Sequence, residues 1–384
     1  MYDNGSFRAL KKIESLCFRM KKICITIAVV FISLCYLGFG PFSVTITKTD
    51  AAGAEFYSVV VEKVENARQV RVKTVNKKGN QEQFLVDTLS DKYISSPEYK
   101  LGDRLVVSVT NVQGKRIASI IERDRTIPYL ILAALFVAVV IVIGRLQGAV
   151  AIIAMALSFI LLTAVTIPQI IEGVDPIVVS LLTGLIIVPL TFYFSHGLNQ
   201  KTSLAILATL ISLTITGSLA ALFTYLTSLT GYASEEAAAV TFRFGSMLKL
   251  SNLVIAGMII SSMGILDDVT ISQIGIVHSL SKAKPNMNTA QLFSEAMKLG
   301  RDHIASLVNT LVLIYVGAAL PMFLLIYKSD IPIWIVLQRE AVAEEIVRTL
   351  VSSIGIILAV PIATVFGIRW GRKKVGFLQR EKLF

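Results

Sequence analysis

A series of apolar segments, each about as long as a membrane is thick, constrains this chain more than any other feature. A helix needs about 20 apolar residues to cross the hydrocarbon of a bilayer. The segments of about that length are residues 23–44, 128–143, 148–167, 176–194, 203–226, 252–277, 304–327 and 345–368. The sequence therefore predicts an α-helical polytopic membrane protein with about eight transmembrane helices.

The amino-acid composition supports this class. Of the 384 residues, 54% are hydrophobic and 16% are charged. Soluble globular domains carry roughly 25% charged residues, and disordered chains have a low apolar content. The composition thus excludes an ordinary soluble enzyme and an intrinsically disordered chain.

The formal net charge of +11 has a topological meaning in such a chain. Basic residues gather in the two termini and in the loops that an eight-helix arrangement puts on the same side. Cytoplasmic segments of membrane proteins carry this excess of Lys and Arg, and the anionic inner leaflet attracts them. We therefore expect cytoplasmic termini, the lipid bilayer as a partner, and no nucleic-acid binding.

This orientation divides the chain into consecutive parts. They are a basic cytoplasmic N-terminus (1–22), a transmembrane signal anchor (23–44), an extracytoplasmic domain (45–126), a seven-span membrane core (127–368) and a basic cytoplasmic tail (369–384). The anchor segment is longer than the roughly 7–15 apolar residues of a cleavable signal peptide. We expect it to be retained, and cleavage is the alternative.

The segment between the first two apolar segments has a different pattern. Residues 55–75 alternate β-branched and polar side chains, as half-buried strands do. Shorter alternating runs follow at residues 83–87, 104–110 and 116–122. Short strands at this spacing predict a small all-β domain, either an OB-like barrel or a sandwich. Because residues 45–126 contain no His and no Cys, we expect a compact envelope-facing domain without catalysis.

Two adjacent acids, Asp267 and Asp268, lie in the middle of the apolar segment 252–277. Small and polar residues gather on the helical face through Asp268. These are Gly257, Ser261, Gly264, Ser272 and Gly275. Small residues let helices approach closely, so that the carboxylate faces protein.

Acids inside a membrane are costly and commonly act as proton or ion relays. Burial and mutual repulsion favour a pair that holds one proton, which makes Asp267 and Asp268 relay candidates. The alternative is that they mark the hydrated cytoplasmic end of a shorter span, next to Arg301.

The next apolar segment supplies polar residues that suit the same chemistry. They are Arg301, Asp302, His303, Asn309 and Thr310. We expect Arg301 or His303, at the cytoplasmic start, to gate or neutralise the two acids. Asn309 and Thr310, together with Ser272, would offer hydrogen bonds. In the last segment Glu344 precedes Arg348 by one helical turn, and we expect a structural ion pair there, near the outer surface.

Patterns for enzymes and cofactors are missing from the sequence. His196, His278 and His303 show no metal-ligand spacing, and there is no HExxH motif or glycine-rich phosphate loop. Neighbouring residues on a helix point about 100° apart, which suits a protease-like acid dyad poorly. We expect no enzymatic activity, no metal and no cofactor.

Three motifs carry a resemblance to a known family. The runs GMIISSMGILDDVTISQ (Gly257–Gln273), GRDHIASLVNTLVLIYVGAALP (Gly300–Pro321) and EIVRTLVSSIGIILAVPIAT (Glu345–Thr364) resemble the YibE/F-like family of bacterial membrane proteins. The resemblance implies a multi-spanning protein of the bacterial plasma membrane and names no activity. The residues that match the motifs are Asp267, Asp268, Gln273, Arg301, Asp302, His303, Asn309 and Arg348.

The chain is also similar, more weakly, to resistance–nodulation–division permeases and to the SecD/SecF export factors. The shared features are an outer domain after the first span, an acidic pair after a glycine, and a proline near the end of the last span, here Pro361. In those permeases intramembrane aspartates carry protons. This chain departs from them by two additional spans and a far smaller outer domain.

Two functions follow as hypotheses. The first is a transport-class protein, a proton- or ion-coupled permease or exporter that works through Asp267 and Asp268 on an unassigned small molecule or ion. The second is a non-transporting assembly or scaffold protein of the cell envelope, in which the β-domain docks a partner. An envelope protein or a second copy of the chain is a further partner that either hypothesis allows.

Overall fold

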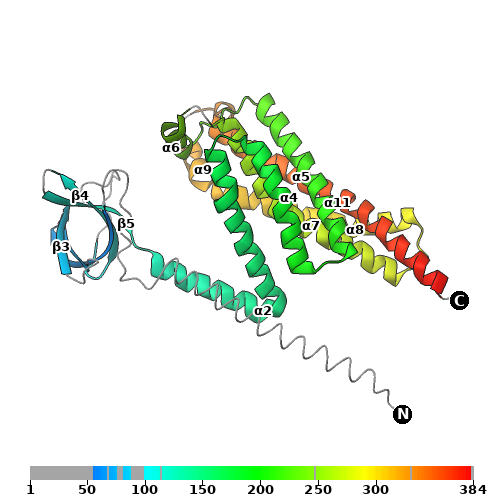
Figure 1. Cartoon of the computed structure of the whole chain (residues 1–384). Coiled ribbons are helices and arrows are strands. Elements are labelled where there is room, and N and C mark those ends of the chain that lie inside the picture. Colours follow the sequence, from blue (N-terminus) through cyan, green and yellow to red (C-terminus); the bar gives the residue numbers. More distant parts are fainter. Residues whose placement is uncertain are drawn as a thin grey trace, which may run out of the picture. The chain divides into compact units, whose positions relative to one another are not determined.

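The computed structural model describes residues 55–66, 69–75, 81–87, 99–112, 115–245, 248–328 and 331–381. The chain forms two compact units, Met1–Ala149 and Val150–Phe384 (Figure 1). The first unit contains a set of strands and the beginning of a long helix, and the second unit is helical. The predicted N-terminal region and signal anchor, residues 1–44, lie outside the described residues.

The strands of the first unit close into a barrel. They are β1 (Glu55–Asn66), β2 (Gln69–Val75), β3 (Gln81–Asp87), β4 (Arg104–Val112) and β5 (Lys115–Arg123). The order around the barrel is β1–β2–β3–β5–β4, and β1 pairs with β4 to close it. Only the β3–β5 pair is parallel among these strands. The prediction of a small all-β domain is confirmed, as a barrel and not a sandwich.

Side-chain alternation explains why these strands enclose a core. The buried side chains are Tyr57, Val59 and Val61 of β1, Val70 and Val72 of β2, Val86 of β3, Leu105, Val107 and Val109 of β4, and Ala118 and Ile120 of β5. Cross-strand partners such as Val59 and Leu105 meet inside the barrel. A shift by one residue would turn this apolar set outward, so the pattern fixes the register.

Asp124 connects the barrel to the helix that follows it. Its carboxylate accepts hydrogen bonds from the Ser58 hydroxyl on β1 (2.7 Å) and from the Thr126 amide at the helix start (2.9 Å). Its own amide donates to the Arg104 carbonyl on β4 (2.9 Å). Partial burial acts to raise the pKa of Asp124, but the hydrogen bonds and the charge of Arg104 outweigh it and hold this pKa below its usual value.

We expect Asp124→Ala to destabilise the barrel by about 1 kcal/mol at neutral pH, because a capping bond and a cross-strand bond are lost. A carboxyl whose pKa is lowered by folding stabilises the fold above its unfolded pKa, and the contribution disappears as the pH falls through the folded pKa. The difference between wild type and Asp124→Ala should therefore narrow as the pH falls below about 4, the usual pKa of an Asp side chain in an unfolded chain.

Hydrogen–deuterium exchange of the β4 and β5 amides, corrected for the intrinsic rate at each pH, measures this difference. Asp124→Asn is the control, since it keeps the capping oxygen and loses the titration. A difference that persists undiminished at acidic pH would contradict the assignment.

Helix α2 (Thr126–Leu161) contains a break between the predicted spans 128–143 and 148–167. Arg145 has φ 50° and ψ −129°, which lies outside the helical region. After α2 the chain forms a π-turn, η2 (Leu162–Thr166), and then α3 (Ile167–Ile171). The π-turn precedes Pro168, whose missing N–H interrupts the α-helical ladder.

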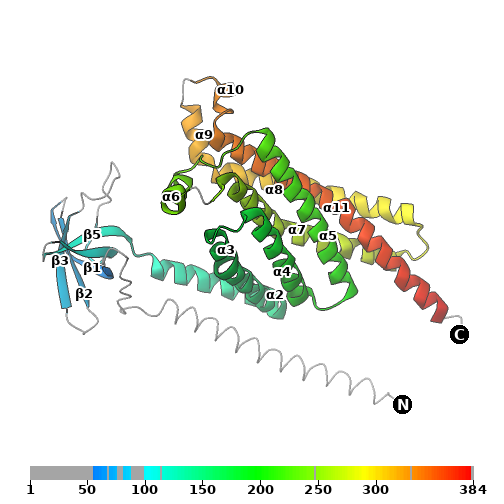
Figure 2. The same cartoon turned by 45° about the horizontal axis from the view of Figure 1, so that its top comes forward.

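The second unit is a bundle of helices (Figure 2). The long ones are α4 (Pro176–His196), α5 (Gln200–Leu226), α7 (Leu250–Ala283), α8 (Thr289–Ala318) and α11 (Glu340–Glu381), and the short ones are α6 (Glu235–Phe244), α9 (Leu320–Tyr327) and α10 (Ile333–Val336). By length and composition, five described helices can cross a membrane: Thr126–Ile171, Pro176–His196, Gln200–Leu226, Leu250–Ala283 and Glu340–Arg369. They agree with a multi-spanning protein, whereas the count of eight spans is not confirmed.

The predicted span 304–327 differs from the structure at both ends. Helix α8 already begins at Thr289, because Asn288 and Gln291 form a capping box that starts a helix where a loop was expected. Pro321 lies in the first turn of α9, and its missing N–H prevents α8 from continuing. These two local signals outweigh the hydropathy on which the prediction rested.

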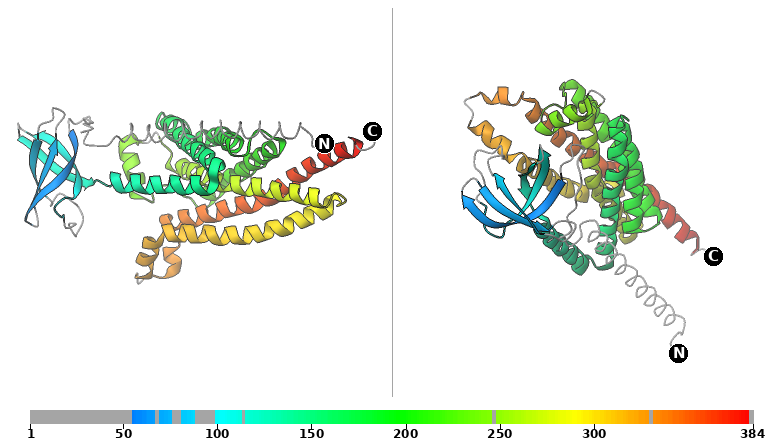
Figure 3. Two further views of the ribbon diagram at one scale, coloured as in Figure 1. Left: turned by 90° about the horizontal axis from the view of Figure 1, so that it is seen from below. Right: turned by 60° about the vertical axis from the view of Figure 1, so that its left-hand side comes forward.

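Helix α7 packs against α4, α5, α8 and α11, and α8 also lies along α11 (Figure 3). Hydroxyl pairs join α7 to two of these neighbours. Thr270 pairs with Thr209 of α5 at 2.6 Å, and Ser262 donates to Ser352 of α11 at 3.0 Å. Hydrogen bonds between helices satisfy polar groups where no water is available. Because α7 contacts four neighbouring helices and forms such hydroxyl pairs with two of them, it is the central helix of the bundle.

Helices α5 and α11 approach closely at Gly355. A Cβ atom at this position would overlap the Thr216 hydroxyl of α5 and come 3.0 Å from the Thr216 Cβ. Rotation of the Thr216 side chain does not relieve this contact, because rotation leaves the Thr216 Cβ atom in place.

We therefore expect Gly355→Ala to cost about 1–3 kcal/mol through overpacking and to lower the melting temperature in detergent. Gly257→Ala on α7 is the matched control, since a Cβ atom there meets nothing within 4 Å. Equal melting temperatures for the two variants would show that the close approach is not required.

Candidate functional site

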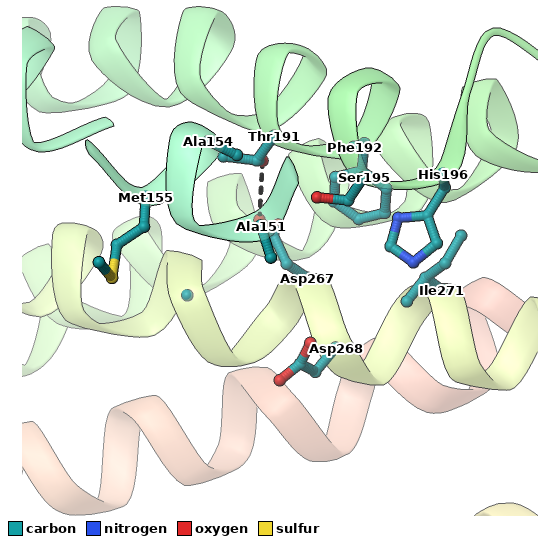
Figure 4. A pocket seen from close by; sticks show the side chains of 11 residues that line it. Ala151, Ala154, Met155, Thr191, Phe192, Ser195, His196, Asp267, Asp268 and Ile271 are labelled. Carbon is teal, nitrogen blue, oxygen red and sulfur yellow. Dashed lines mark hydrogen bonds between the residues drawn. The ribbon is translucent and has the colours of Figure 1, made fainter. Parts of the chain in front are cut away.

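A pocket of about 230 Å³ lies in the helical unit around the two predicted acids (Figure 4). Its lining consists of Ala151, Ala154 and Met155 of α2, Thr191, Phe192, Ser195 and His196 of α4, and Gly264, Asp267, Asp268 and Ile271 of α7. The lining from α2 is apolar, whereas α4 and α7 supply the polar groups. Both predicted acids thus belong to the wall of one cavity.

Thr191 lies opposite Asp267 because α4 and α7 are aligned at their starts. The Asn252 side chain near the start of α7 donates to Asp175 at the start of α4 (2.7 Å). Asp175 also caps α4 by accepting from the Ile177 amide (2.8 Å). Thr191 and Asp267 lie at similar distances along their helices from that contact, and a hydrogen bond joins their side chains. The two helices therefore run parallel.

The two carboxyl oxygens of Asp267 have different surroundings. Oδ2 accepts a hydrogen bond from the Thr191 hydroxyl at 3.3 Å. Oδ1 is buried and has no hydrogen-bond partner among the described residues. A buried polar atom without a partner costs about 1–3 kcal/mol, and more when it is charged. A proton or a cation held at Asp267 would lower that cost.

Asp268 points away from Thr191 and is exposed (Figure 4). No hydrogen bond joins its carboxyl to that of Asp267 in the described part of the chain, so a directly shared proton has no contact to support it. Gly257, Ser261, Gly264 and Ser272 of the small-residue face are exposed as well, whereas Gly275 is half-buried beside Lys201 of α5. Contrary to expectation, the described helices do not pack closely at the four exposed positions, because α5 and α11 cover the larger apolar side chains of α7 instead.

His196 is placed at the pocket by the turn between α4 and α5. Gly197 has φ 78°, a conformation that suits glycine at the end of a helix. Asn199 donates to the His196 carbonyl (2.8 Å) and caps α5 by accepting from the Thr202 amide (2.9 Å). The His196 ring also lies near Phe192, with 6.0 Å between ring centroids. A tight, capped turn thus holds the imidazole at the end of the cavity.

The predicted partners on α8 are not in the pocket. Neither Arg301 nor His303 lines it, and within the described ranges no ion pair or hydrogen bond connects either residue to Asp267 or Asp268. The alternative in which Arg301 pairs with the acids therefore has no contact behind it. The loop expected before residue 304 is helical, which changes where these side chains stand.

The other predicted polar residues on α7 and α8 also lie outside the lining. Asp302, Asn309 and Ser272 are exposed. The Thr310 hydroxyl donates to the Ser306 carbonyl of its own helix (2.9 Å). These positions supply no hydrogen bond to either acid in the described residues.

Gln273 connects three helices. Its side chain is buried, and its amide nitrogen donates to the Ala296 carbonyl of α8 (3.0 Å) and to the Thr364 hydroxyl of α11 (2.8 Å). The structure thus gives Gln273 a role in packing and none in the pocket.

The ion pair predicted in the last span is present. Arg348 pairs with Glu344 one turn earlier and with Glu345 at 2.9 Å. Helical pairs at these spacings contribute a few tenths of a kcal/mol, which is consistent with a structural role.

Sequence reasoning missed the part of the site that α4 supplies. Thr191, Ser195 and His196 gather at the end of the segment 176–194, where one polar residue follows another every few positions. That clustering was the available signal, but the partner of α4 could not be inferred without the helix packing. Metal chemistry receives no support from the described residues, in which no three or more His, Cys, Asp or Glu side chains are grouped to hold an ion.

The sequence pattern of the YibE/F-like protein family matches residues 132–373. This range exceeds half of the chain and contains every residue that lines the pocket. The chain belongs to the YibE/F-like family. The predicted resemblance is confirmed, and the pocket lies in the YibE/F-like core. No curated protein and no solved structure matches the chain.

We expect Gln273→Leu to lower the stability of the YibE/F-like core by about 1 kcal/mol, since hydrogen bonds between membrane helices contribute about this amount. Thermal unfolding in detergent measures the change. The adjacent, exposed Ser272 provides the control, because Ser272→Ala removes no contact between helices. A Gln273→Leu variant as stable as wild type would refute the connecting role.

Proposed function

We propose that this YibE/F-like protein is of transport class and moves protons, or ions coupled to protons, through the pocket at Asp267. The proposal is carried by the buried Asp267 oxygen that has no partner, beside a cavity and near the middle of a helix long enough to span a membrane. Carboxyls at such a depth are costly, and where they occur they commonly serve as relays.

The groups next to Asp267 suit a stepwise transfer. Asp268 is exposed on the same pocket wall, and His196 lies at the end of α4. Histidine exchanges protons near neutral pH, so His196 takes the gating role that the sequence assigned to Arg301 or His303. The transported species is an ion or small molecule that fits a cavity of about 230 Å³, and the proposal includes no cofactor and no catalysis.

A scaffold of the cell envelope is the competing function, and the barrel is the observation that favours it. Its interior is filled by apolar side chains, so a partner would bind to its outer surface. In this alternative the acids stabilise the bundle instead of carrying protons, and their removal changes stability and not flux.

We further propose that the barrel is an OB-like domain outside the cell. The closed order β1–β2–β3–β5–β4 suits the five-stranded barrel of that class. Basic termini favour the cytoplasmic side of a bacterial plasma membrane, and an odd number of spans between the N-terminus and the barrel then puts the barrel on the outer side. An envelope protein or a second copy of the chain is the partner we expect there.

We expect Asp267→Asn to reduce proton flux about a hundredfold, the loss typical when a proton-transfer group is removed. Asp268→Asn should reduce it less, because Asp268 is exposed and replaceable by water. The flux is measured in proteoliposomes under an imposed pH gradient, with a pH-sensitive dye inside the vesicles. Na⁺ or K⁺ is added outside the vesicles.

Glu295→Gln is the matched control, since Glu295 is exposed on α8 and outside the pocket. Wild-type flux that persists in Asp267→Asn combined with Asp268→Asn would refute the relay. If wild type itself moves no ions and the double variant melts at a lower temperature, the scaffold function is favoured instead.

A further inference from the structure

The Thr191 hydroxyl lies within hydrogen-bond distance of three acceptors and has one hydrogen to donate. The acceptors are the Ile187 carbonyl at 3.0 Å, the Val188 carbonyl at 3.1 Å and the Asp267 Oδ2 atom at 3.3 Å. The first two belong to its own helix, and the third belongs to α7. The hydroxyl can therefore donate its hydrogen either to a carbonyl of α4 or to the Asp267 carboxyl.

The protonation state of Asp267 determines which of these acceptors receives the Thr191 hydrogen. When the carboxyl is ionised, it only accepts, and the Thr191 hydrogen turns toward Oδ2. When Oδ2 carries a proton, the acid donates to the Thr191 oxygen, and the Thr191 hydrogen returns to the Ile187 or Val188 carbonyl. On release the proton passes to water in the pocket, so that a neutral acid becomes a carboxylate and the hydroxyl reverses.

The bond that is made and broken lies within one turn of Pro189. Pro189 is inside α4 and has no N–H to donate to the Leu185 carbonyl one turn earlier. A Thr hydroxyl bonded to a carbonyl of the preceding turn bends a helix. The Thr191 bond to the turn that contains Ile187 and Val188 thus acts on a helix already interrupted by proline.

All of the pocket lining from α4 lies beyond this point. Thr191, Phe192, Ser195 and His196 follow Pro189 in the sequence. A change in the direction of α4 at Pro189 therefore moves one wall of the pocket relative to α7.

We propose that Thr191 is a positioning residue that transmits the protonation state of Asp267 to the pocket wall formed by α4. The inference rests on the proposed function in that Asp267 gains and loses a proton. It adds the way in which this event changes access to the pocket, through one hydroxyl and one proline.

Charged and titratable groups lie around Asp267, but among the described residues only Thr191 forms a hydrogen bond with its carboxyl group. On α7 the neighbour is Asp268, on α4 it is His196, and α2 contributes only apolar lining. From α5, the Lys201 ammonium lies near Gly275, about two turns further along α7. Helices α8 and α11 supply no lining residue.

The test measures the position of the end of α4 at acidic and alkaline pH. Spin labels are attached to the full chain at Phe194→Cys on α4 and Ser279→Cys on α7, both exposed positions outside the pocket. Cys17, Cys24 and Cys35 are replaced by Ser so that labelling is specific. Pulsed electron paramagnetic resonance then gives the distribution of distances between the labels.

We expect the wild-type distribution to change with pH and Asp267→Asn to hold the acidic form at both values. Thr191→Val, which keeps the shape and removes the hydroxyl, should abolish the change, and Thr191→Ser should retain it. Proton flux should fall about tenfold in Thr191→Val, since residues that couple two sites contribute about this factor. Thr191→Ser should retain the wild-type flux. A distribution that still responds to pH in Thr191→Val, or that never responds in wild type, would overturn the proposal.

The two proposals fail separately. If flux depends on Asp267 while Thr191→Val leaves the pH response intact, the role of Thr191 is wrong and the proton relay stands. If the label distance depends on pH through Thr191 while no flux occurs, the conformational coupling is supported and transport is refuted.

Discussion

A carboxyl group in the middle of an apolar helix needs a partner, and the surroundings of Asp267 follow from that need. Other polar side chains of α7 have partners on neighbouring helices: Thr270 meets α5, Ser262 meets α11, and Gln273 meets α8 and α11. Asp267 has one hydroxyl for two oxygens. The buried polar side chains of α7 are thus satisfied at several points, whereas Asp267 Oδ1, beside the pocket, has no partner among the described residues.

In the proposed relay the two neighbouring acids have different tasks. Asp267 faces α4 and exchanges a single proton, whereas Asp268, which is exposed, meets an ion or water directly. A pair that shared one proton would need the carboxyls to face each other, which adjacent positions on a helix do not allow. The proposed proton transfer therefore runs between α7 and α4, and the part of the cavity lining that α2 supplies is apolar.

Much of this arrangement could be predicted from local sequence patterns. Alternation predicts the barrel strands, hydropathy finds the long helices, and an acid pair in an apolar segment identifies the cavity wall. The partners of that pair could not be predicted, because they depend on which helices are adjacent. Arg301 and His303 follow α7 closely in sequence, yet the alignment of α4 with α7 through Asn252 and Asp175 puts Thr191 there instead. The early start of α8 escaped hydropathy because a capping box is a short polar signal.

The proposed function depends on the gain and loss of a proton at Asp267 while this side chain faces the pocket. Infrared difference spectroscopy of the full protein in lipid, recorded between acidic and alkaline pH, observes the carbonyl stretch of a protonated carboxylic acid directly. We predict a carboxylic acid band that appears at acidic pH, disappears at alkaline pH and is missing in Asp267→Asn, while Glu295→Gln retains it. A spectrum in which Asp267→Asn and wild type show the same carboxylic acid bands at every pH would contradict proton exchange at Asp267.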